Sequence, residues 1–190
     1  VRNRPQRWCD HGFHEVSMNT SESPSSTRIS TSEREAEVWR ALGEVPDPEI
    51  PVLSLVELGV IRSVRLQKSG VEVEMTPTFT GCPALERMKE DVELKLKSKG
   101  FEPVVIRVNH AVAWSTDNLA EATKEKLRVF GIAPPPKTTA SLAVTLELPV
   151  ACPFCSSART HLESPFGATL CKQIYYCDSC LQSFERFKPL

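Results

Sequence analysis

Two Cys-x-x-Cys pairs near the C-terminus constrain the fold of this chain more than any other feature of its sequence. Cys152 and Cys155 lie in CPFC, Cys177 and Cys180 lie in CDSC, and 21 residues separate the two pairs. Each pair places two sulfur atoms on one tight turn, and two such turns supply the four thiolates of a tetrahedral metal site. The spacing therefore predicts a structural zinc ion bound by these four cysteines. A pair of redox motifs and an iron–sulfur cluster on the same cysteines are the alternatives.

The segment around these cysteines is short, which also favours a metal site. Residues 140–190 are strand-like and too few to bury a large core, so we expect a β-rich zinc ribbon that the ion stabilises. An ion with four thiolate ligands has no open coordination position, and we therefore expect no catalysis by it. Phe184 and Phe187 are expected to cover the metal site, and Cys171 to be a small buried strand residue. Three prolines within residues 133–139 predict a linker between two domains.

The composition limits the partners and the compartment. The 23 basic and 24 acidic residues give a net charge of −1, so no overall positive charge favours nucleic acid or an anionic membrane. No apolar run reaches the roughly 18 residues of a membrane span, and no secretory pattern is present. Seven cysteines without an export signal are typical of a reducing compartment, so we expect a cytoplasmic protein. Residues 1–31 are polar, lack a regular hydrophobic period and are expected to be a disordered extension.

Hydrophobic periodicity predicts an α+β domain over residues 32–132. Ser32 followed by Glu35 forms a capping-box pattern, which predicts that the first helix begins there. The order of the predicted elements is helix, strand, strand, helix, strand, helix. After the first helix, their expected ranges are 60–66, 71–77, 83–99, 104–108 and about 117–130. A small sheet covered by helices on one face is the natural packing for this order.

Cys82 stands alone in the sequence TFTGCPA (78–84), far from the clustered cysteines. Proline favours the first position of a helix, so Pro83 places Cys82 close to the start of the second predicted helix. The helix dipole and the free N–H groups there favour a thiolate and lower the pKa of the thiol. Gly81 is expected to allow a tight turn or a close approach to another group. Cys82 is therefore either a reactive or metal-coordinating sulfur, or a small buried core residue.

A short acidic run, Asp47-Pro48-Glu49, is the second candidate feature of this domain. Its proline restricts the local backbone and would help to aim both carboxylates. A carboxylate pair beside a lone thiolate could hold iron. In the alternative interpretation Asp47 begins a turn and Glu49 is solvated. Glu57 and His110 are further candidates, with a structural role as the alternative for each.

Three stretches resemble the MIP18 family: DPEIPVLSLVELGVI (47–61), TFTGCPA (78–84) and AWSTDNLAEATKEKLRVFGI (113–132). The resemblance implies a MIP18-like α-β-β-α-β-α domain and a part in the assembly and delivery of iron–sulfur clusters. The functional cysteine of the family corresponds to Cys82, and the carboxylates correspond to Asp47 and Glu49. Many relatives carry a proline shortly after the tryptophan that follows the third strand, and residues 114–117 of this chain lack it.

The C-terminal part, with CPFC, SPFGATLCKQIYYCDSC (164–180) and FERFKPL, is similar to the D-component (PaaD) family of the ring 1,2-phenylacetyl-CoA epoxidase system. This resemblance implies phenylacetate catabolism and a factor that assembles or delivers a metal centre, iron–sulfur or iron, without itself catalysing the epoxidation. An accessory, non-catalytic subunit of the epoxidase complex is the alternative. The implied partners are the di-iron oxygenase and the iron–sulfur reductase. Cys171 belongs to a motif of this family, which makes it an alternative ligand.

A single thiolate does not hold a cluster. If Cys82 carries a transient iron–sulfur cluster or iron, further ligands must complete the site. A second copy of the chain in a homodimer, a partner protein and a small thiol are the three possible sources. Neither nucleic acid nor a membrane is an expected partner, because the charge is near zero and the basic residues are scattered.

Overall fold

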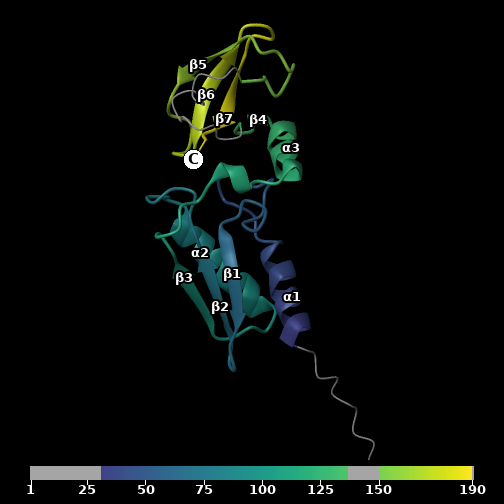
Figure 1. Cartoon of the computed structure of the whole chain (residues 1–190), viewed down its shortest axis with the longest axis vertical. Helices are drawn as coiled ribbons and strands as arrows, with labels where there is room; N and C mark the ends of the chain where they lie inside the picture. Colours follow the sequence, from purple (N-terminus) through teal and green to yellow (C-terminus); the bar gives the residue numbers. More distant parts are fainter. Residues whose placement is uncertain (1–30, 137–149, 190) are drawn as a thin grey trace, which may run out of the picture.

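The computed structural model describes residues 31–136 and 150–189, and its first part is a small α+β domain (Figure 1). The expected disordered extension therefore lies outside the described residues, except for Thr31. The predicted α+β class and order of elements are confirmed. The elements of the first part are α1 (Thr31–Leu42), β1 (Ile61–Leu66), β2 (Val71–Met75), α2 (Leu85–Ser98), β3 (Val104–Val108), the 3-10 helix η1 (Thr116–Asn118), α3 (Glu121–Val129) and β4 (Ile132–Ala133).

The first sheet has the order β1-β2-β3, with β1 and β2 antiparallel and β2 and β3 parallel. Alternate residues of β2 are fully buried, because α1 packs against β1 and α2 packs against β3 on that side. The other face is polar: the carboxylate of Glu72 lies 3.5 Å from Arg65 and 3.1 Å from Arg107. The sheet thus has helices on one face, as predicted.

Two predicted helix starts differ from the structure. Ser32 already lies within α1, and α2 begins at Leu85, two residues beyond Pro83. The single predicted final helix consists of η1 and α3, because Leu119 and Ala120 between them have extended backbone angles. The Ser115 hydroxyl accepts a hydrogen bond of 3.2 Å from the Asp117 N–H and caps η1.

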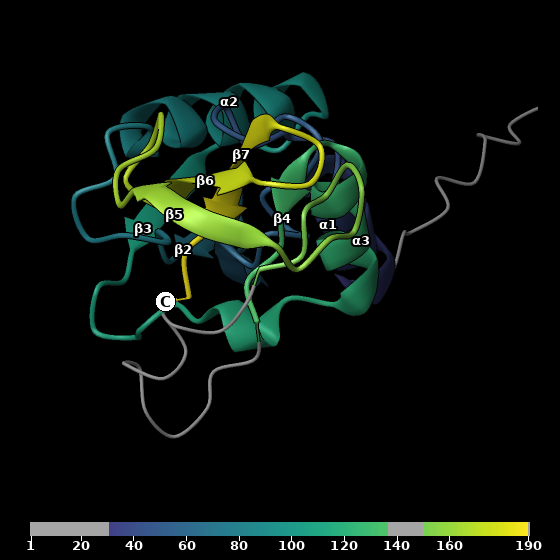
Figure 2. The same cartoon turned by 90° about the horizontal axis from the view of Figure 1, so that it is seen from above.

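The second sheet has the order β4-β7-β6-β5 and contains the C-terminal strands β5 (Thr160–Ser164), β6 (Lys172–Cys177) and β7 (Gln182–Phe187). Its fourth strand comes from the first part of the chain: β4 runs parallel to β7, with Ala133 opposite Arg186. Ala133 was expected to begin the linker, and it is a paired strand residue instead. Seen from above, the ribbon strands cross over the α+β domain (Figure 2).

The two parts of the chain share a hydrophobic core. The main buried cluster of the α+β domain also contains Cys171 and Phe187 from the ribbon. The Phe187 ring centroid lies 5.8 Å from that of Trp114, whose indole N–H donates to the Leu58 carbonyl at 3.0 Å. Phe184 belongs to a second cluster around the ribbon cysteines, as predicted, whereas the prediction for Phe187 was wrong. The ribbon is therefore packed onto the first domain by its own last strand.

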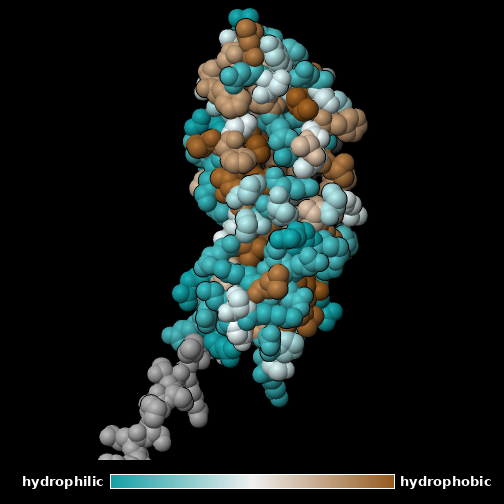
Figure 3. All heavy atoms as spheres, turned by 180° about the vertical axis from the view of Figure 1, so that it is seen from behind, coloured by the Kyte–Doolittle hydropathy of each residue, from teal (hydrophilic) through white to brown (hydrophobic). Residues whose placement is uncertain are grey.

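The surface is mixed in character. Figure 3 shows hydrophobic residues mainly on the upper part of the molecule, where the ribbon and α3 lie, and a mostly hydrophilic lower part. Exposed apolar residues near the end of α3 and on the cysteine turns include Val129, Phe130, Phe154 and Leu181. Within the ranges described above, none of the helices combines the length and the apolar character needed to cross a bilayer.

Candidate functional site

The four ribbon cysteines lie on two turns of matching geometry. In the first turn the Ser156 N–H donates to the Cys152 carbonyl at 2.9 Å, and in the second the Leu181 N–H donates to the Cys177 carbonyl at 2.9 Å. Ser156 and Leu181 both adopt a positive φ, 61° and 60°. This left-handed residue after each pair reverses the chain and leaves both sulfurs of the pair on the same side.

The sulfur positions fit one metal ion. The four Sγ atoms lie within 4.8 Å of one another. The Cys152–Cys180 and Cys155–Cys177 sulfur distances are 3.7 Å and 3.6 Å. Metal–sulfur bonds of about 2.3 Å in a tetrahedron place the sulfurs about 3.8 Å apart, which matches these distances. A cluster with several irons would separate the cysteines more widely. The backbone N–H of Cys180 lowers the pKa of Cys177 to about 7, whereas burial and the neighbouring thiols raise the pKa of Cys180 to about 12, so of these two Cys177 more readily forms the thiolate that a metal requires.

Cys82 occupies the turn that leads into α2. Its N–H donates to the Phe79 carbonyl at 3.0 Å, and its own carbonyl accepts from the Leu85 N–H at 3.3 Å. The side chain is half-buried and packs against the main core. Gly81 beside it has no positive φ, and a Cβ at that position would meet no atom within 4 Å. Gly81 thus lies in a tight turn, which was one of the two expectations, whereas no other group approaches it closely.

The pKa of Cys82 is raised, contrary to the prediction from the helix start. Burial raises it most, and the backbone N–H groups of Ala84 and Leu85 lower it by less. The negative charges of Glu49 and Asp47 raise it further. The helix-start prediction was wrong because the dipole acts on a sulfur that is desolvated and faces two carboxylates.

Asp47 fixes the turn that carries Glu49. Its Oδ1 accepts hydrogen bonds from the N–H groups of Glu49 at 2.8 Å and Ile50 at 2.7 Å, and the residue is buried. Burial raises the pKa of Asp47, while these hydrogen bonds and the charge of Lys172 lower it. Asp47 thus begins a turn, as one of the two interpretations of the sequence had it. Glu49 is half-buried, and burial and the charge of Asp47 raise its pKa.

Cys171 joins this group from the ribbon. Its sulfur lies 4.0 Å from Oε2 of Glu49 and 3.1 Å from the Thr169 hydroxyl. Burial raises the pKa of Cys171, and the charge of Glu49 raises it as well, whereas the Thr169 hydroxyl and the charge of Lys172 lower it. Lys172 itself is buried, with Nζ 2.8 Å from Glu185. Cys171 therefore contacts Glu49 directly, whereas Cys82 is linked to Glu49 and Asp47 by the effect of their charges; we call these four residues the interdomain site (Asp47, Glu49, Cys82 and Cys171).

A close turn positions the ribbon side of the interdomain site. The Gly167 N–H donates to the Lys172 carbonyl at 3.0 Å, and a Cβ on Gly167 would lie 2.9 Å from the Lys172 carbonyl carbon. Only glycine allows this approach without a shift of the loop. In the sequence Lys172 is only one of a few scattered basic residues. Its place beside the carboxylates was missed, because the packing of the ribbon on the first domain brings them together.

The interdomain site is wider than a site for one ion. Within residues 31–136 and 150–189, only the four ribbon cysteines bring three or more potential ligand atoms within 4.8 Å of one another. Glu57 is engaged elsewhere: Ser54 donates to it through its N–H and its hydroxyl, both at 3.0 Å, and Lys126 pairs with it. His110 lines a pocket of about 360 Å³ at the ends of β2 and β3, together with Phe79.

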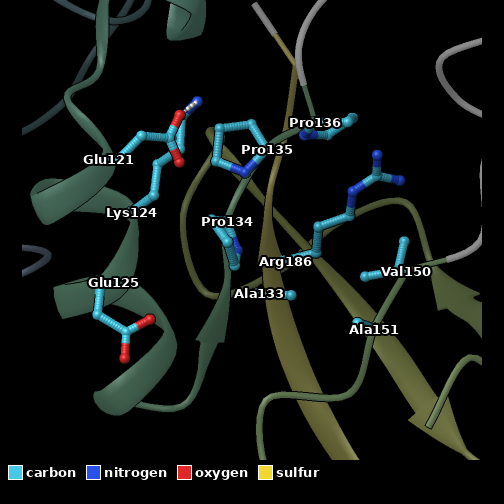
Figure 4. A pocket seen from close by; sticks show the side chains of 10 residues that line it. All are labelled: Glu121, Lys124, Glu125, Ala133, Pro134, Pro135, Pro136, Val150, Ala151 and Arg186. Atoms are coloured by element: carbon cyan, nitrogen blue, oxygen red, sulfur yellow. Dashed lines mark hydrogen bonds and ion pairs between the residues drawn. The ribbon is translucent and has the colours of Figure 1, made fainter. Parts of the chain in front are cut away.

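A second pocket, of about 420 Å³, lies between α3 and the ribbon sheet (Figure 4). Lys124 is paired with Glu121 at 3.0 Å on one side, and Arg186 donates to the Tyr175 hydroxyl at 2.7 Å on the other. Pro136 and Val150 line this pocket and flank residues 137–149, which are outside the described residues. We therefore assign it no ligand.

Comparisons with known proteins match both parts of the chain. The family described as "Iron-sulfur cluster assembly protein" matches residues 35–109, and the "PaaD zinc beta ribbon domain" matches residues 135–188. The putative D component of the 1,2-phenylacetyl-CoA epoxidase of Escherichia coli (strain K12) is 40% identical over 152 residues, which are 80% of this chain and 91% of that protein.

Shorter proteins match the first domain. The "Fe-S protein maturation auxiliary factor" of Porphyromonas gingivalis (strain ATCC BAA-308 / W83) is 39% identical over 89 residues, 46% of this chain and 84% of that protein. Among solved structures, a domain of unknown function, DUF59, from Bacillus anthracis is 25% identical, with a TM-score of 0.46 over 49% of this chain and 90% of that chain.

Proposed function

The chain belongs to the D-component family of the 1,2-phenylacetyl-CoA epoxidase system, and from this premise we propose that it assembles or delivers an iron or iron–sulfur centre for the epoxidase complex of phenylacetate catabolism. Its relatives support a role in the epoxidase system or in iron–sulfur assembly. Our proposal joins the two: the chain is a maturation factor, and the epoxidase subunits that carry iron are its partners. It performs no epoxidation itself.

The observation that carries this proposal is the interdomain site. The negative charges of Glu49 and Asp47 act on Cys82 and raise the pKa of its thiol. Partly buried acidic groups without a full set of countercharges attract a cation, because a metal ion relieves the repulsion between them. Thiolates and carboxylates together are suitable ligands for iron. Unlike the ribbon cysteines, these groups do not enclose an ion, which suits a cargo that must leave again.

Uptake and release are ligand exchanges. When iron binds, the Cys82 sulfur loses its proton to solvent and forms the iron–sulfur bond, and the oxidation state of the iron does not change. Glu49 adds a carboxylate oxygen, while Asp47 holds the turn that presents it. Release reverses the bond as a ligand of the acceptor protein replaces the sulfur. The space beside Gly81, the residue before Cys82, is free of other atoms, and we propose that such a ligand approaches there.

We propose that the ion of the ribbon is zinc, bound by Cys152, Cys155, Cys177 and Cys180. The family description and the tetrahedral sulfur spacing support this choice. With four thiolates the ion has no open position, so it stabilises the ribbon. We place the protein in the cytoplasm, because two sets of reduced cysteines are needed for these roles. Further ligands of the cargo come from an epoxidase subunit or from a second copy of the chain in a homodimer.

The experiment that tests the function uses cells that contain the epoxidase system. Replacing the chain by its Cys82→Ser variant should lower the iron content and the activity of the purified epoxidase together. The matched control is Cys9→Ser, which removes a thiol outside the described residues. Epoxidase that keeps its full iron content with Cys82→Ser would show that the chain does not deliver iron through this residue.

An accessory, non-catalytic subunit is the second candidate function, and the exposed apolar surface near α3 favours it. Val129, Phe130, Phe154 and Leu181 are 51–74% exposed, and a Cβ on Gly131 would lie 3.3 Å from the Phe154 ring, so the end of α3 adjoins the first cysteine turn. Aromatic and aliphatic side chains of this kind are enriched in the centres of interfaces. Stoichiometric co-purification with active epoxidase that already contains its iron would favour this role.

A further inference from the structure

The strand β3 forms one margin of the first sheet, and no strand of the described part of the chain pairs with its outer side (Figure 1). The Pro103 carbonyl accepts a hydrogen bond of 2.9 Å from β2, and the Asn109 N–H donates one of 2.8 Å to β2. Residues two apart in a strand direct their backbone groups to the same side. The N–H and C=O groups of Val104, Ile106 and Val108 therefore point outward, away from β2.

The other strands at the margins of the two described sheets carry features that discourage pairing with a further strand. The register of β1 is irregular near its start, and this strand exposes Arg62 and Arg65. The register of β5 is irregular as well, and β5 exposes His161 and Glu163. The strand β4 has only two residues. Bulges, charges and short length are the usual protections of edge strands. By contrast, β3 pairs regularly with β2 along all five residues and has a single charged side chain.

The apolar side chains of β3 are incompletely covered. On the face that carries the helices, the alternate residues of β2 are at most 1% exposed, whereas Val104 and Ile106 of β3 are only half-buried. Both pack against the main core with part of their surface. On the other face Val105 is 38% exposed. A further strand beside β3 would remove this apolar surface from water, which favours its binding.

The polar face of the sheet next to this margin has an excess of positive charge. Arg107 and Arg65 share the single carboxylate of Glu72, at 3.1 Å and 3.5 Å, and their side chains are 67% and 70% exposed. The neighbouring carboxylate of Glu74 accepts a hydrogen bond from the Asn109 amide at 2.7 Å. An acidic side chain on an added strand would give the exposed Arg107 guanidinium a carboxylate partner of its own.

We propose that β3 binds an extended segment of another protein, which adds a fourth strand to the first sheet and alternates apolar with acidic side chains. The outward backbone groups of β3 hold this segment by hydrogen bonds, and alternate side chains give the specificity. Its apolar side chains lie on the side of α2, beside Val104 and Ile106. Its acidic side chains lie on the polar face, beside Arg107. The surface involves neither Cys82 nor the ribbon and does not depend on the proposed function.

A second copy of the chain does not fit this margin. The helix α2 packs against β3. Antiparallel pairing of two β3 strands about a two-fold axis would leave both α2 helices on the same face of the joined sheet. These helices would then lie over strands about 4.8 Å apart, whereas packed helices need about 8–10 Å between their axes. A segment without a helix on that face avoids this collision.

The test is peptide binding by the full chain, with the ribbon ion in place. Three seven-residue peptides with blocked ends are the probes. The first alternates valine with glutamate, the second alternates valine with lysine, and the third is the valine–glutamate peptide with methylated backbone nitrogens. Nuclear magnetic resonance gives the affinity of each peptide and the hydrogen-exchange rate of each backbone amide of β3.

We expect the valine–glutamate peptide to slow the exchange of the Val104, Ile106 and Val108 amides and to bind more tightly than the valine–lysine peptide. The methylated peptide should not bind, because it cannot donate backbone hydrogen bonds. Equal binding of all three peptides, or no protection of these amides by the first, would overturn the proposal. A chain that dimerises and protects the same amides without peptide would also overturn it, since a second copy would then occupy β3.

Two pairs of variants separate backbone pairing from charge. Val108→Pro removes one outward N–H, which edge strands tolerate, and should bind the valine–glutamate peptide about fivefold more weakly than Val108→Ala, which keeps it. Arg107→Gln should weaken binding about two- to fivefold. Its matched control, Arg87→Gln, removes an exposed arginine of α2 and should bind like wild type. Thermal unfolding shows whether each variant is folded, and the exchange rates of the wild-type chain decide the case if Val108→Pro is not. Wild-type affinity in a folded Val108→Pro or in Arg107→Gln would contradict the proposal.

Discussion

The sulfur of Cys171 and Oε2 of Glu49 lie 4.0 Å apart, although 122 positions separate the two residues in the sequence. The contact depends on packing between two domains. Phe187 is fully buried against the core of the first domain and is the last residue of β7. The strand β7 pairs with β6, and Cys171 immediately precedes β6. The ribbon therefore places Cys171 beside Glu49 of the first domain.

The Glu49→Gln variant tests whether Glu49 is the common neighbour of both thiols. The negative charge of Glu49 raises the pKa of Cys82 and of Cys171, so its removal should lower both pKa values. The alkylation rate of each thiol rises with pH as the thiolate forms, and both profiles should shift to lower pH. Glu44→Gln is the control, because Glu44 is paired with Lys95 at 2.5 Å, away from the interdomain site. A shift for only one cysteine would contradict the shared position of Glu49.

Asp47 should matter for stability more through its hydrogen bonds than through its charge. Asp47→Ala leaves two buried N–H groups, those of Glu49 and Ile50, without their acceptor, which should cost about 1–3 kcal/mol in the free energy of unfolding. Asp47→Asn keeps an oxygen acceptor and should lose much less. Urea unfolding of the three proteins measures the difference. Equal losses in both variants would mean that the charge itself, or a bound cation, makes the contribution.

The difference in stability between wild type and Asp47→Asn should change with pH in a defined direction. Burial raises the pKa of Asp47, so the folded chain holds this proton more tightly than the unfolded chain does. Its contribution to stability is present at low pH and is lost as the pH rises above about 4, the pKa of an exposed aspartate. Wild type should therefore gain stability relative to Asp47→Asn as the pH falls toward about 4. The opposite trend would show that a cation or Lys172 dominates at this carboxylate.

Local patterns in the sequence predicted the elements well. The strand Val104–Val108 has the predicted bounds, and β2 (Val71–Met75) lies within the predicted range 71–77. The turn at Asp47 was also one of the two interpretations, since aspartate commonly accepts from the N–H groups two or three residues ahead. These features depend on residues that are close together in the chain, so they can be predicted from the sequence alone.

The pKa of Cys82 and the place of Cys171 could not be predicted in the same way. A helix start lowers the pKa of a thiol, but burial beside Glu49 and Asp47 outweighs it, and burial is a property of the folded chain. Likewise Phe187 was expected to cover the metal site together with Phe184. Both residues lie in β7, and residues three apart in a strand point to opposite faces, so Phe184 lies with the cysteines and Phe187 with Trp114.

Removal of the ribbon ion should disturb the first domain as well as the ribbon. The ribbon cluster is small, so without its metal the sheet β5–β7 should unfold. Phe187 would then leave Trp114, which is 8% exposed, and the indole would meet water. A variant with Trp8→Phe and Trp39→Phe leaves Trp114 as the fluorescent reporter. Its emission should shift to longer wavelength on chelation, and return on addition of zinc. An unchanged spectrum after complete metal loss would show that the two domains are not coupled through this contact.

The two glycines of the interdomain site should respond in opposite ways to replacement by alanine. In Gly167→Ala the new Cβ would lie 2.9 Å from the Lys172 carbonyl carbon, so the loop must move and carry Cys171 with it. We expect the ribbon to keep its zinc while iron binding at the interdomain site weakens about tenfold. In Gly81→Ala the new Cβ meets no atom within 4 Å, so the thermal unfolding and the binding of free iron should remain as in wild type.

The rate of iron transfer to the epoxidase should further distinguish Gly81→Ala from Gly167→Ala. If a ligand of the acceptor approaches Cys82 through the open space at Gly81, Gly81→Ala should slow the transfer of iron to the epoxidase while leaving iron uptake intact. Iron uptake and transfer are measured on the same preparations of both variants. Gly167→Ala with wild-type iron affinity would show that the loop around Gly167 does not shape the interdomain site. Gly81→Ala with a normal transfer rate would show that the acceptor reaches Cys82 from another side.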